Sequence, residues 1–166
     1  IANQIKKLDI VIVSVGGGGL ISGISQYLKL RWPDIHIVGC SPKNSAVMLQ
    51  SILSEEILEM ESKFTLSDGT AGGLEKRSIT YPLCKSFIDQ SILVSESDIK
   101  KAMKLYFKFE NQIIEGAAGV AIAALLNCVH AIIYHDSRLE RGRHLECSLQ
   151  CAPVGATRIF RLAFRA

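Results

Sequence analysis

Runs of apolar residues in the first forty positions predict a strand, a helix and a second strand. Residues 9–15 (DIVIVSV) are almost continuously apolar and rich in Val and Ile, which is typical of a strand buried on both faces of a parallel sheet. Apolar residues then recur at helical spacing from Leu20 to Trp32, and Pro33 marks the end of that helix. Residues 34–40 (DIHIVGC) predict the second strand. A strand, a glycine-rich loop, a helix and a strand in this order predict a βαβ unit.

The rest of the chain continues the alternation of helices and strands. We expect helices over 45–60, 78–88, 98–114 and 115–133, and a short strand over 90–96. Ser97 is expected to cap the third of these helices, because its hydroxyl can accept a free backbone N–H. The last helix is apolar nearly all round, which predicts that it is buried. Residues 61–74 form a long loop with three glycines, and long loops in compact domains are often functional.

Composition places the chain among globular proteins. It has 166 residues, a net charge of +3, 48% apolar residues and 21% charged residues. The sequence contains no apolar run of the ~20 residues that a membrane span needs, and no signal peptide pattern. The basic residues are dispersed, which argues against nucleic acid as a partner. Because the chain opens with Ile1 and reaches a strand within ten residues, we expect it to be part of something longer.

The cysteines and histidines suggest no metal centre. The five cysteines are scattered without a C-x-x-C pair, and the four histidines form no ligand pattern. Free thiols in a reducing cytoplasm are the simplest interpretation, so we expect a cytoplasmic protein.

Four consecutive glycines, Gly16, Gly17, Gly18 and Gly19, separate the first strand from the first helix. A nucleotide-binding P-loop would need Lys-Ser/Thr next, but Leu20 and Ile21 follow. A dinucleotide fingerprint would need a third glycine in register and an acidic residue after the second strand, where Ser41 stands. A single phosphate group on backbone N–H groups at a helix N-terminus needs neither. The alternative is a tight turn without ligand, for which one glycine would be enough.

Four segments of the chain, in order and with preserved spacing, resemble one enzyme family. They are SVGGGGLISGI (14–24), LSDGTAGGLE (66–75), SILVSESDIKKAM (91–103) and IIEGAAGVAIAALL (113–126). They resemble the fold-type-II pyridoxal-phosphate enzymes, in the branch of the serine/threonine dehydratases (ammonia-lyases) and serine racemase. The resemblance covers about residues 5 to 130. It implies an α/β fold, a parallel doubly wound sheet with helices on both faces, as in the tryptophan-synthase β-like proteins. Residues 1–166 would be the later part of the cofactor domain, with an atypical tail over 140–166.

The resemblance also implies roles for individual residues. The N–H groups of Gly16 to Gly19 would bind the phosphate of pyridoxal phosphate, Gly69 would lie against the cofactor, and Glu115 would stand near its ring. Cys151, or less well Gln150, stands where the family places the partner of the pyridine nitrogen. From the residues alone, Glu115 is equally a carboxylate favoured by a helix dipole, and Cys151 a small buried thiol.

Two departures from the family limit what this chain can do. Ser41 and Val47 stand where metal-binding members carry a Glu and an Asp, and valine cannot coordinate a hard cation, so we expect no metal there. The lysine that forms the Schiff base lies upstream in the family, and no lysine of this chain follows that motif, so no catalytic residue is assigned.

The activity implied for the full-length parent is β-elimination from L-threonine or L-serine, giving a 2-oxo acid and ammonia. An amino-acid racemase or a hydroxy-amino-acid lyase of the same fold is an alternative, and so is a non-catalytic remnant. The chain alone is expected to be inactive. We expect it to form a homo-oligomer or to associate with the missing N-terminal half, because a strand such as residues 9–15 is a poor edge to leave open.

Overall fold

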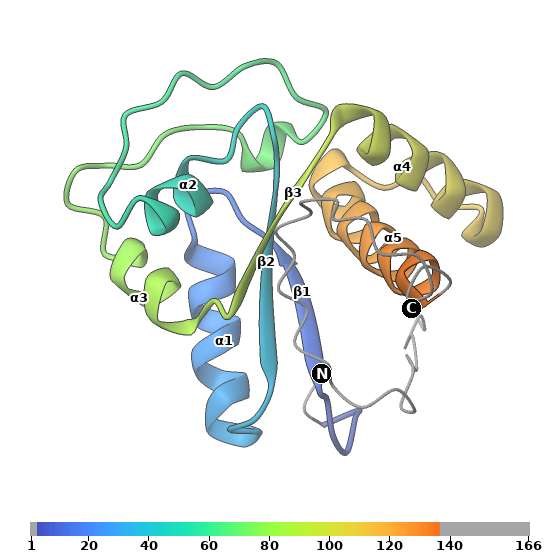
Figure 1. Cartoon of the computed structure of the whole chain (residues 1–166), viewed down its shortest axis with the longest axis horizontal. Helices are drawn as coiled ribbons and strands as arrows, with labels where there is room; N and C mark the ends of the chain where they lie inside the picture. Colours follow the sequence, from blue (N-terminus) through green and yellow to red (C-terminus); the bar gives the residue numbers. More distant parts are fainter. Residues whose placement is uncertain (1–2, 137–166) are drawn as a thin grey trace.

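A three-stranded parallel sheet forms the centre of the protein, which we describe from a computed structural model (Figure 1). The structure describes the backbone of residues 3–136 and the side chains of residues 3–128. The strands are β1 (Ile10–Ser14), β2 (His36–Pro42) and β3 (Gln90–Val94), in the order β1-β2-β3. Every residue of β2 except the first is buried, as expected for the central strand of a parallel sheet.

Helices cover both faces of the sheet (Figure 1). One face carries α1 (Gly19–Arg31), α2 (Val47–Leu53) and α3 (Thr80–Phe87); the other carries α4 (Glu96–Glu110) and α5 (Gly116–Asp136). Successive residues of β2 supply the two cores, because side chains alternate across a sheet: Ile37 packs with the first group of helices and Val38 with the second. The expectation of an α/β parallel sheet with helices on both faces is confirmed.

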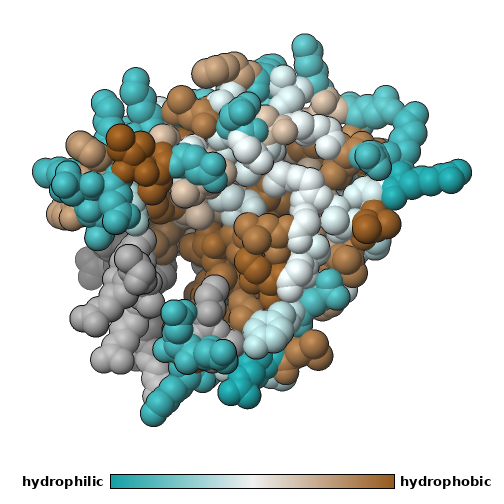
Figure 2. Space-filling model, turned by 180° about the vertical axis from the view of Figure 1, so that it is seen from behind, coloured by the Kyte–Doolittle hydropathy of each residue, from teal (hydrophilic) through white to brown (hydrophobic). Residues whose placement is uncertain are grey.

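Within the described part of the chain, β1 is an edge strand of the sheet. There, β1 is hydrogen-bonded only to β2, and Ile10 is 44% exposed. The outer face of α1 carries Leu20, Tyr27 and Leu30, all exposed. Figure 2 shows hydrophobic residues gathered near the middle of the face opposite to that of Figure 1.

The helix predicted over 45–60 is wrong beyond residue 53. α2 ends at Leu53, Ser54 is its C-cap, and Glu55 adopts a left-handed backbone conformation with φ 61°. The buried Ser51 hydroxyl accepts the Leu58 N–H at 3.0 Å, so the chain folds back over the helix instead of continuing it. Apolar spacing beyond residue 53 still fits a helix, but this side-chain hydrogen bond competes with the helical one.

The predicted cap of α4 is also wrong by two residues. Ser95, rather than Ser97, is the N-cap, and its hydroxyl accepts the Asp98 N–H at 3.2 Å. The helix ends at Glu110, before residue 114, because Asn111 takes the left-handed conformation with φ 53°.

The loop 61–74 contains a short 3-10 helix, η1 (Asp68–Thr70). Among the described helices, none is long and apolar enough to cross a membrane.

Candidate functional site

The glycine run lies at the carboxyl end of β1 and leads directly into α1. Gly18 is the N-cap of α1 with φ 82°, a conformation that favours glycine. The Ser22 N–H donates to the Gly18 carbonyl at 3.0 Å and so closes the first turn of the helix. The N–H groups that precede Ser22 have no acceptor within the helix, since the first four donors of any α-helix lack one. They and the helix dipole can receive an anion.

Alternate glycines of the run have different surroundings: Gly16 and Gly18 are packed against other residues, whereas Gly17 and Gly19 are not. An ideal Cβ on Gly16 would lie 2.9 Å from the Thr70 Cα, and one on Gly18 would lie 2.6 Å from the Cys84 Sγ. Packing therefore demands glycine at these two positions. An ideal Cβ on Gly17 or Gly19 meets no described atom within 4 Å. These two glycines border open space that a side chain would fill, and such a cradle fits a phosphate group.

The turn that carries Gly69 lies beside the start of α5. An ideal Cβ on Gly69 would lie 3.9 Å from the Ala117 Cβ, and one on Gly116 would overlap the Leu66 carbonyl. The Ser14 hydroxyl donates to the Ala117 carbonyl at 2.6 Å, which joins the end of β1 to the first turn of α5. The glycine loop, η1 and the N-terminus of α5 therefore meet at one edge of the sheet, the edge where α/β proteins place their ligands.

Glu115 directly precedes α5 and is exposed. Its carbonyl accepts the Gly119 N–H at 3.1 Å, so it stands at the start of the helix, where the dipole favours a carboxylate. This place is compatible with both roles considered from the sequence. Cys151 and Gln150, the candidate partners of the pyridine nitrogen, lie outside the described residues, as does the tail 140–166.

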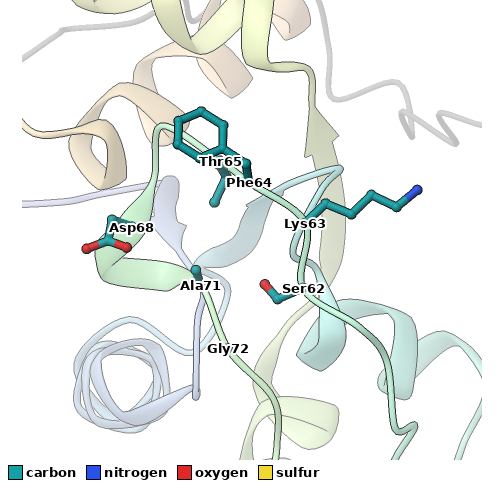
Figure 3. Close-up of a pocket in the computed structure, with 7 residues that line it drawn as sticks. All are labelled: Ser62, Lys63, Phe64, Thr65, Asp68, Ala71 and Gly72. Carbon is teal, nitrogen blue, oxygen red and sulfur yellow. The ribbon is translucent and has the colours of Figure 1, made fainter.

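A pocket of about 450 Å³ opens next to η1 (Figure 3). Its lining residues come from both limbs of the loop 61–74: Ser62, Lys63, Phe64, Thr65, Asp68, Ala71 and Gly72. Ser45 links the two limbs, since its hydroxyl accepts both the Ser62 hydroxyl and, at 3.2 Å, the Gly72 N–H. In Figure 3 the side chain of Lys63 extends away from the pocket.

Several residues around the site carry no signal in the sequence. The carboxylate of Glu96 accepts the Leu66 N–H at 2.8 Å through Oε2, while Oε1 is buried without a hydrogen-bond partner in the described part of the chain. The buried hydroxyls of Ser67 and Thr70 are 2.6 Å apart and brace the turn around Gly69. These contacts join segments far apart in sequence or depend on backbone geometry, so residue spacing cannot find them.

The buried thiols of the two cores hold their protons more tightly than an exposed thiol does. Burial raises the pKa of the Cys84 thiol to about 11 and that of the Cys40 thiol to about 12. Both are therefore protonated at neutral pH, and a protonated thiol is a weak hydrogen-bond donor.

Ser41 and Val47, which stand where metal-binding members of the family carry a Glu and an Asp, are both buried in the interior of the protein. Ser41 is fully buried and donates its hydroxyl to the Val15 carbonyl at 2.7 Å, and Val47 is buried as well. The absence of a metal there stays a prediction.

A parallel α/β sheet with a glycine loop at a helix N-terminus is an arrangement that can receive an anionic group. The family described as "Pyridoxal-phosphate dependent enzyme" matches residues 1–137, and the chain belongs to this family. Pyridoxal phosphate is the cofactor of the family.

Individual relatives give the same result. The chain is 33% identical over 127 residues to an L-threonine ammonia-lyase of Thermotoga maritima, covering 76% of this chain and 31% of that protein. It is 37% identical over 127 residues to the catabolic L-threonine dehydratase TdcB of Staphylococcus aureus, covering 76% of this chain and 36% of the relative. The solved structure of maize serine racemase matches with a TM-score of 0.70 and 31% identity, over 75% of this chain and 37% of the racemase. The chain thus spans about a third of the length of these relatives.

Proposed function

We propose that this chain is part of an enzyme that eliminates water from L-threonine or L-serine and releases a 2-oxo acid and ammonia. The observation that carries the proposal is the cradle at Gly17 and Gly19, which opens at the N-terminus of a helix in a chain similar to threonine ammonia-lyases. When bound, pyridoxal phosphate withdraws electrons from the substrate and makes the proton on its α-carbon acidic.

The residues of this chain would bind and orient the cofactor. The N–H groups of Gly16 to Gly19 would hold the phosphate, and the dipole of α1 would favour its negative charge. Gly69, without a side chain, would allow the ring to approach the turn at η1. Glu115 would stand near the ring from the start of α5. Cys151, or less well Gln150, is the candidate partner of the pyridine nitrogen. The lysine of the Schiff base would come from a segment that matches the upstream part of the relatives.

A chimera tests the reaction. The part of the Thermotoga maritima enzyme that precedes the matched region would be fused to residues 1–166, and the cofactor band and the products would be measured. We expect 2-oxo acid from L-threonine or L-serine. The likeness to maize serine racemase supports a second candidate, for which D-serine would be the product. A chimera that holds the cofactor and forms neither product would contradict both and favour a non-catalytic remnant.

Binding by the chain itself is tested separately. Titration of the ¹⁵N-labelled chain with pyridoxal 5′-phosphate, and in parallel with inorganic phosphate, should shift the amide signals of Gly16 to Gly19. Unchanged signals with both ligands would contradict the proposed phosphate site. Gly17→Val is the matched variant, because its side chain would enter the open space and should abolish the shifts.

A further inference from the structure

The helix α3 lies against the glycine loop and is bonded to its carbonyl groups. The Thr80 hydroxyl donates to the Gly17 carbonyl at 2.6 Å. One turn later, the Cys84 thiol donates to the Gly18 carbonyl at 3.6 Å, a distance in the range of a bond to sulfur. Residues four positions apart share a face of a helix, so one face of α3 holds two successive peptide groups of the loop.

A second hydroxyl, that of Ser78, extends the bond between Thr80 and Gly17 into a short chain of hydrogen bonds. The Ser78 and Thr80 hydroxyl oxygens are 2.8 Å apart. Because the Thr80 proton is directed at the Gly17 carbonyl, the Ser78 hydroxyl is the donor in this pair. Hydrogen bonds in such a chain polarise one another, which strengthens the contact with the loop.

These bonds determine which way the loop N–H groups point. In a planar trans peptide, the C=O of one residue and the N–H of the next point in opposite directions. With the Gly17 carbonyl directed at α3, the Gly18 N–H points away from α3. With the Gly18 carbonyl engaged by Cys84 and Ser22, the Gly19 N–H likewise points away from these donors.

We infer that Thr80 is a positioning residue of the phosphate site, and that Cys84 supports it: the Thr80 hydroxyl fixes the Gly17–Gly18 peptide so that its N–H faces the phosphate. This inference rests on the proposed function. It explains why a loop of four glycines, which alone would be among the most mobile segments of a chain, can present N–H groups in one fixed orientation.

Substitutions that keep the shape of the side chain and change only its hydrogen bond test the inference. Thr80→Val replaces the hydroxyl by a methyl group, and Thr80→Ser keeps the hydroxyl. Removing one bond that orders the loop should weaken binding of pyridoxal 5′-phosphate to the full chain by about tenfold in Thr80→Val, and only slightly in Thr80→Ser. Ser86→Ala, on an exposed position of the same helix, serves as the control for α3.

Four further measurements separate positioning from simple packing. Affinity for inorganic phosphate should fall in Thr80→Val as much as affinity for the cofactor does, since only the phosphate contact is affected. The ¹³C shift of the Gly17 carbonyl should change without ligand, because it reports loss of the hydrogen bond. The melting temperature should stay close to that of Thr80→Ser. Cys84→Ser, which retains a donor, should bind phosphate more tightly than Cys84→Val.

The outcomes are distinct. If the unaltered chain binds no phosphate, the proposed phosphate site is contradicted and the inference about Thr80 is overturned with it, whereas the proposed reaction is still decided by the chimera. If the unaltered chain binds and Thr80→Val binds equally well, the proposed function stands and the inference about Thr80 is overturned. If Thr80→Val loses binding only in proportion to a fall in melting temperature that Thr80→Ser shares, Thr80 is a packing residue and the inference is also overturned.

Discussion

Gly16 lies directly against the backbone of Thr70: an ideal Cβ on Gly16 would be 2.9 Å from the Thr70 Cα and 3.0 Å from its carbonyl oxygen. The contact joins the glycine loop to the turn of η1, which contains Gly69. The two segments that the family resemblance assigns to the cofactor therefore lie against each other through backbone atoms, with no room for a side chain on Gly16 between them.

Alanine should have different consequences at Gly16 and at Gly17, because only a side chain on Gly16 would meet another part of the backbone. Gly16→Ala should destabilise the fold by about 1–3 kcal/mol, because the methyl group meets backbone that cannot rotate away. Gly17→Ala should change the stability little, since its methyl group enters open space, but should weaken phosphate binding. Urea unfolding and phosphate titration of both variants check this. Equal stability of the two variants would contradict the described packing.

A second pair of glycines lies at α5. An ideal Cβ on Gly116 would overlap the Leu66 carbonyl, whereas one on Gly119 would meet the Met103 side chain at 2.8 Å. Gly116→Ala should therefore cost about 3 kcal/mol or more, because backbone must shift. Gly119→Ala should cost only about 1 kcal/mol, because a methionine side chain adapts. Thermal unfolding compares the two; a smaller loss for Gly116→Ala would mean that the loop 61–74 does not cross α5 as described.

The sequence predicts the elements whose cause is local. The apolar run before the glycines forms β1, and Pro33 follows the end of α1 closely, because periodicity and chain breakers act within a few residues. The helix over 45–60 was predicted too long because the bond between Ser51 and Leu58 is invisible to apolar spacing.

From the sequence, only two features of the candidate site could be predicted: the phosphate loop itself, and the order in which the segments of the site follow one another along the chain. The glycine run indicated a phosphate site by itself, whereas Gly69 and Glu115 entered through the family resemblance. Thr80 was missed because it lies 63 residues from Gly17 in the sequence, and nothing in the residues around it indicates a contact with the loop. A contact of this kind depends on how α3 packs on α1, which only the folded chain shows.

Burial of the two thiols predicts a loss of stability at high pH. The pKa of Cys40 and Cys84 is raised in the folded chain to about 12 and about 11, from an ordinary value near 9.0. Their contribution is fully present below pH 9 and is lost as the pH rises through the folded values, because the unfolded chain then releases protons that the folded chain retains.

As the pH rises, the free energy of unfolding should fall by up to about 1.4 kcal/mol per pH unit for each thiol. Urea unfolding at pH 8 and pH 10.5 measures it, with Cys84→Ala as the reference, since other groups also titrate in this range. A fall in stability of the same size in Cys84→Ala would show that Cys84 does not contribute.

The outer face of α1 predicts association. Leu20, Tyr27 and Leu30 are 67%, 58% and 86% exposed and recur at helical spacing along one face. We expect the chain to self-associate, or to pair with a chain that supplies the upstream part of the family fold, because apolar side chains gain by leaving water. Light scattering after size-exclusion chromatography should show a larger mass for the unaltered chain than for Leu20→Glu/Leu30→Glu. A monomeric unaltered chain would contradict this.

The chain alone should not turn over L-threonine or L-serine. Elimination needs a lysine that bonds the cofactor and takes the proton from the α-carbon, and no lysine of this chain follows the family motif. Lys63 is the lysine that lines the pocket beside η1, and it extends away from that pocket (Figure 3). The purified chain, supplied with pyridoxal phosphate and either amino acid, should therefore form no 2-oxo acid, and cofactor held only by its phosphate should be lost on dialysis.

Gly17→Val and Lys63→Ala complete the experiment. Sustained turnover that Gly17→Val abolishes would show that the chain suffices for the reaction, and its loss in Lys63→Ala as well would identify Lys63 as the group that has replaced the upstream lysine.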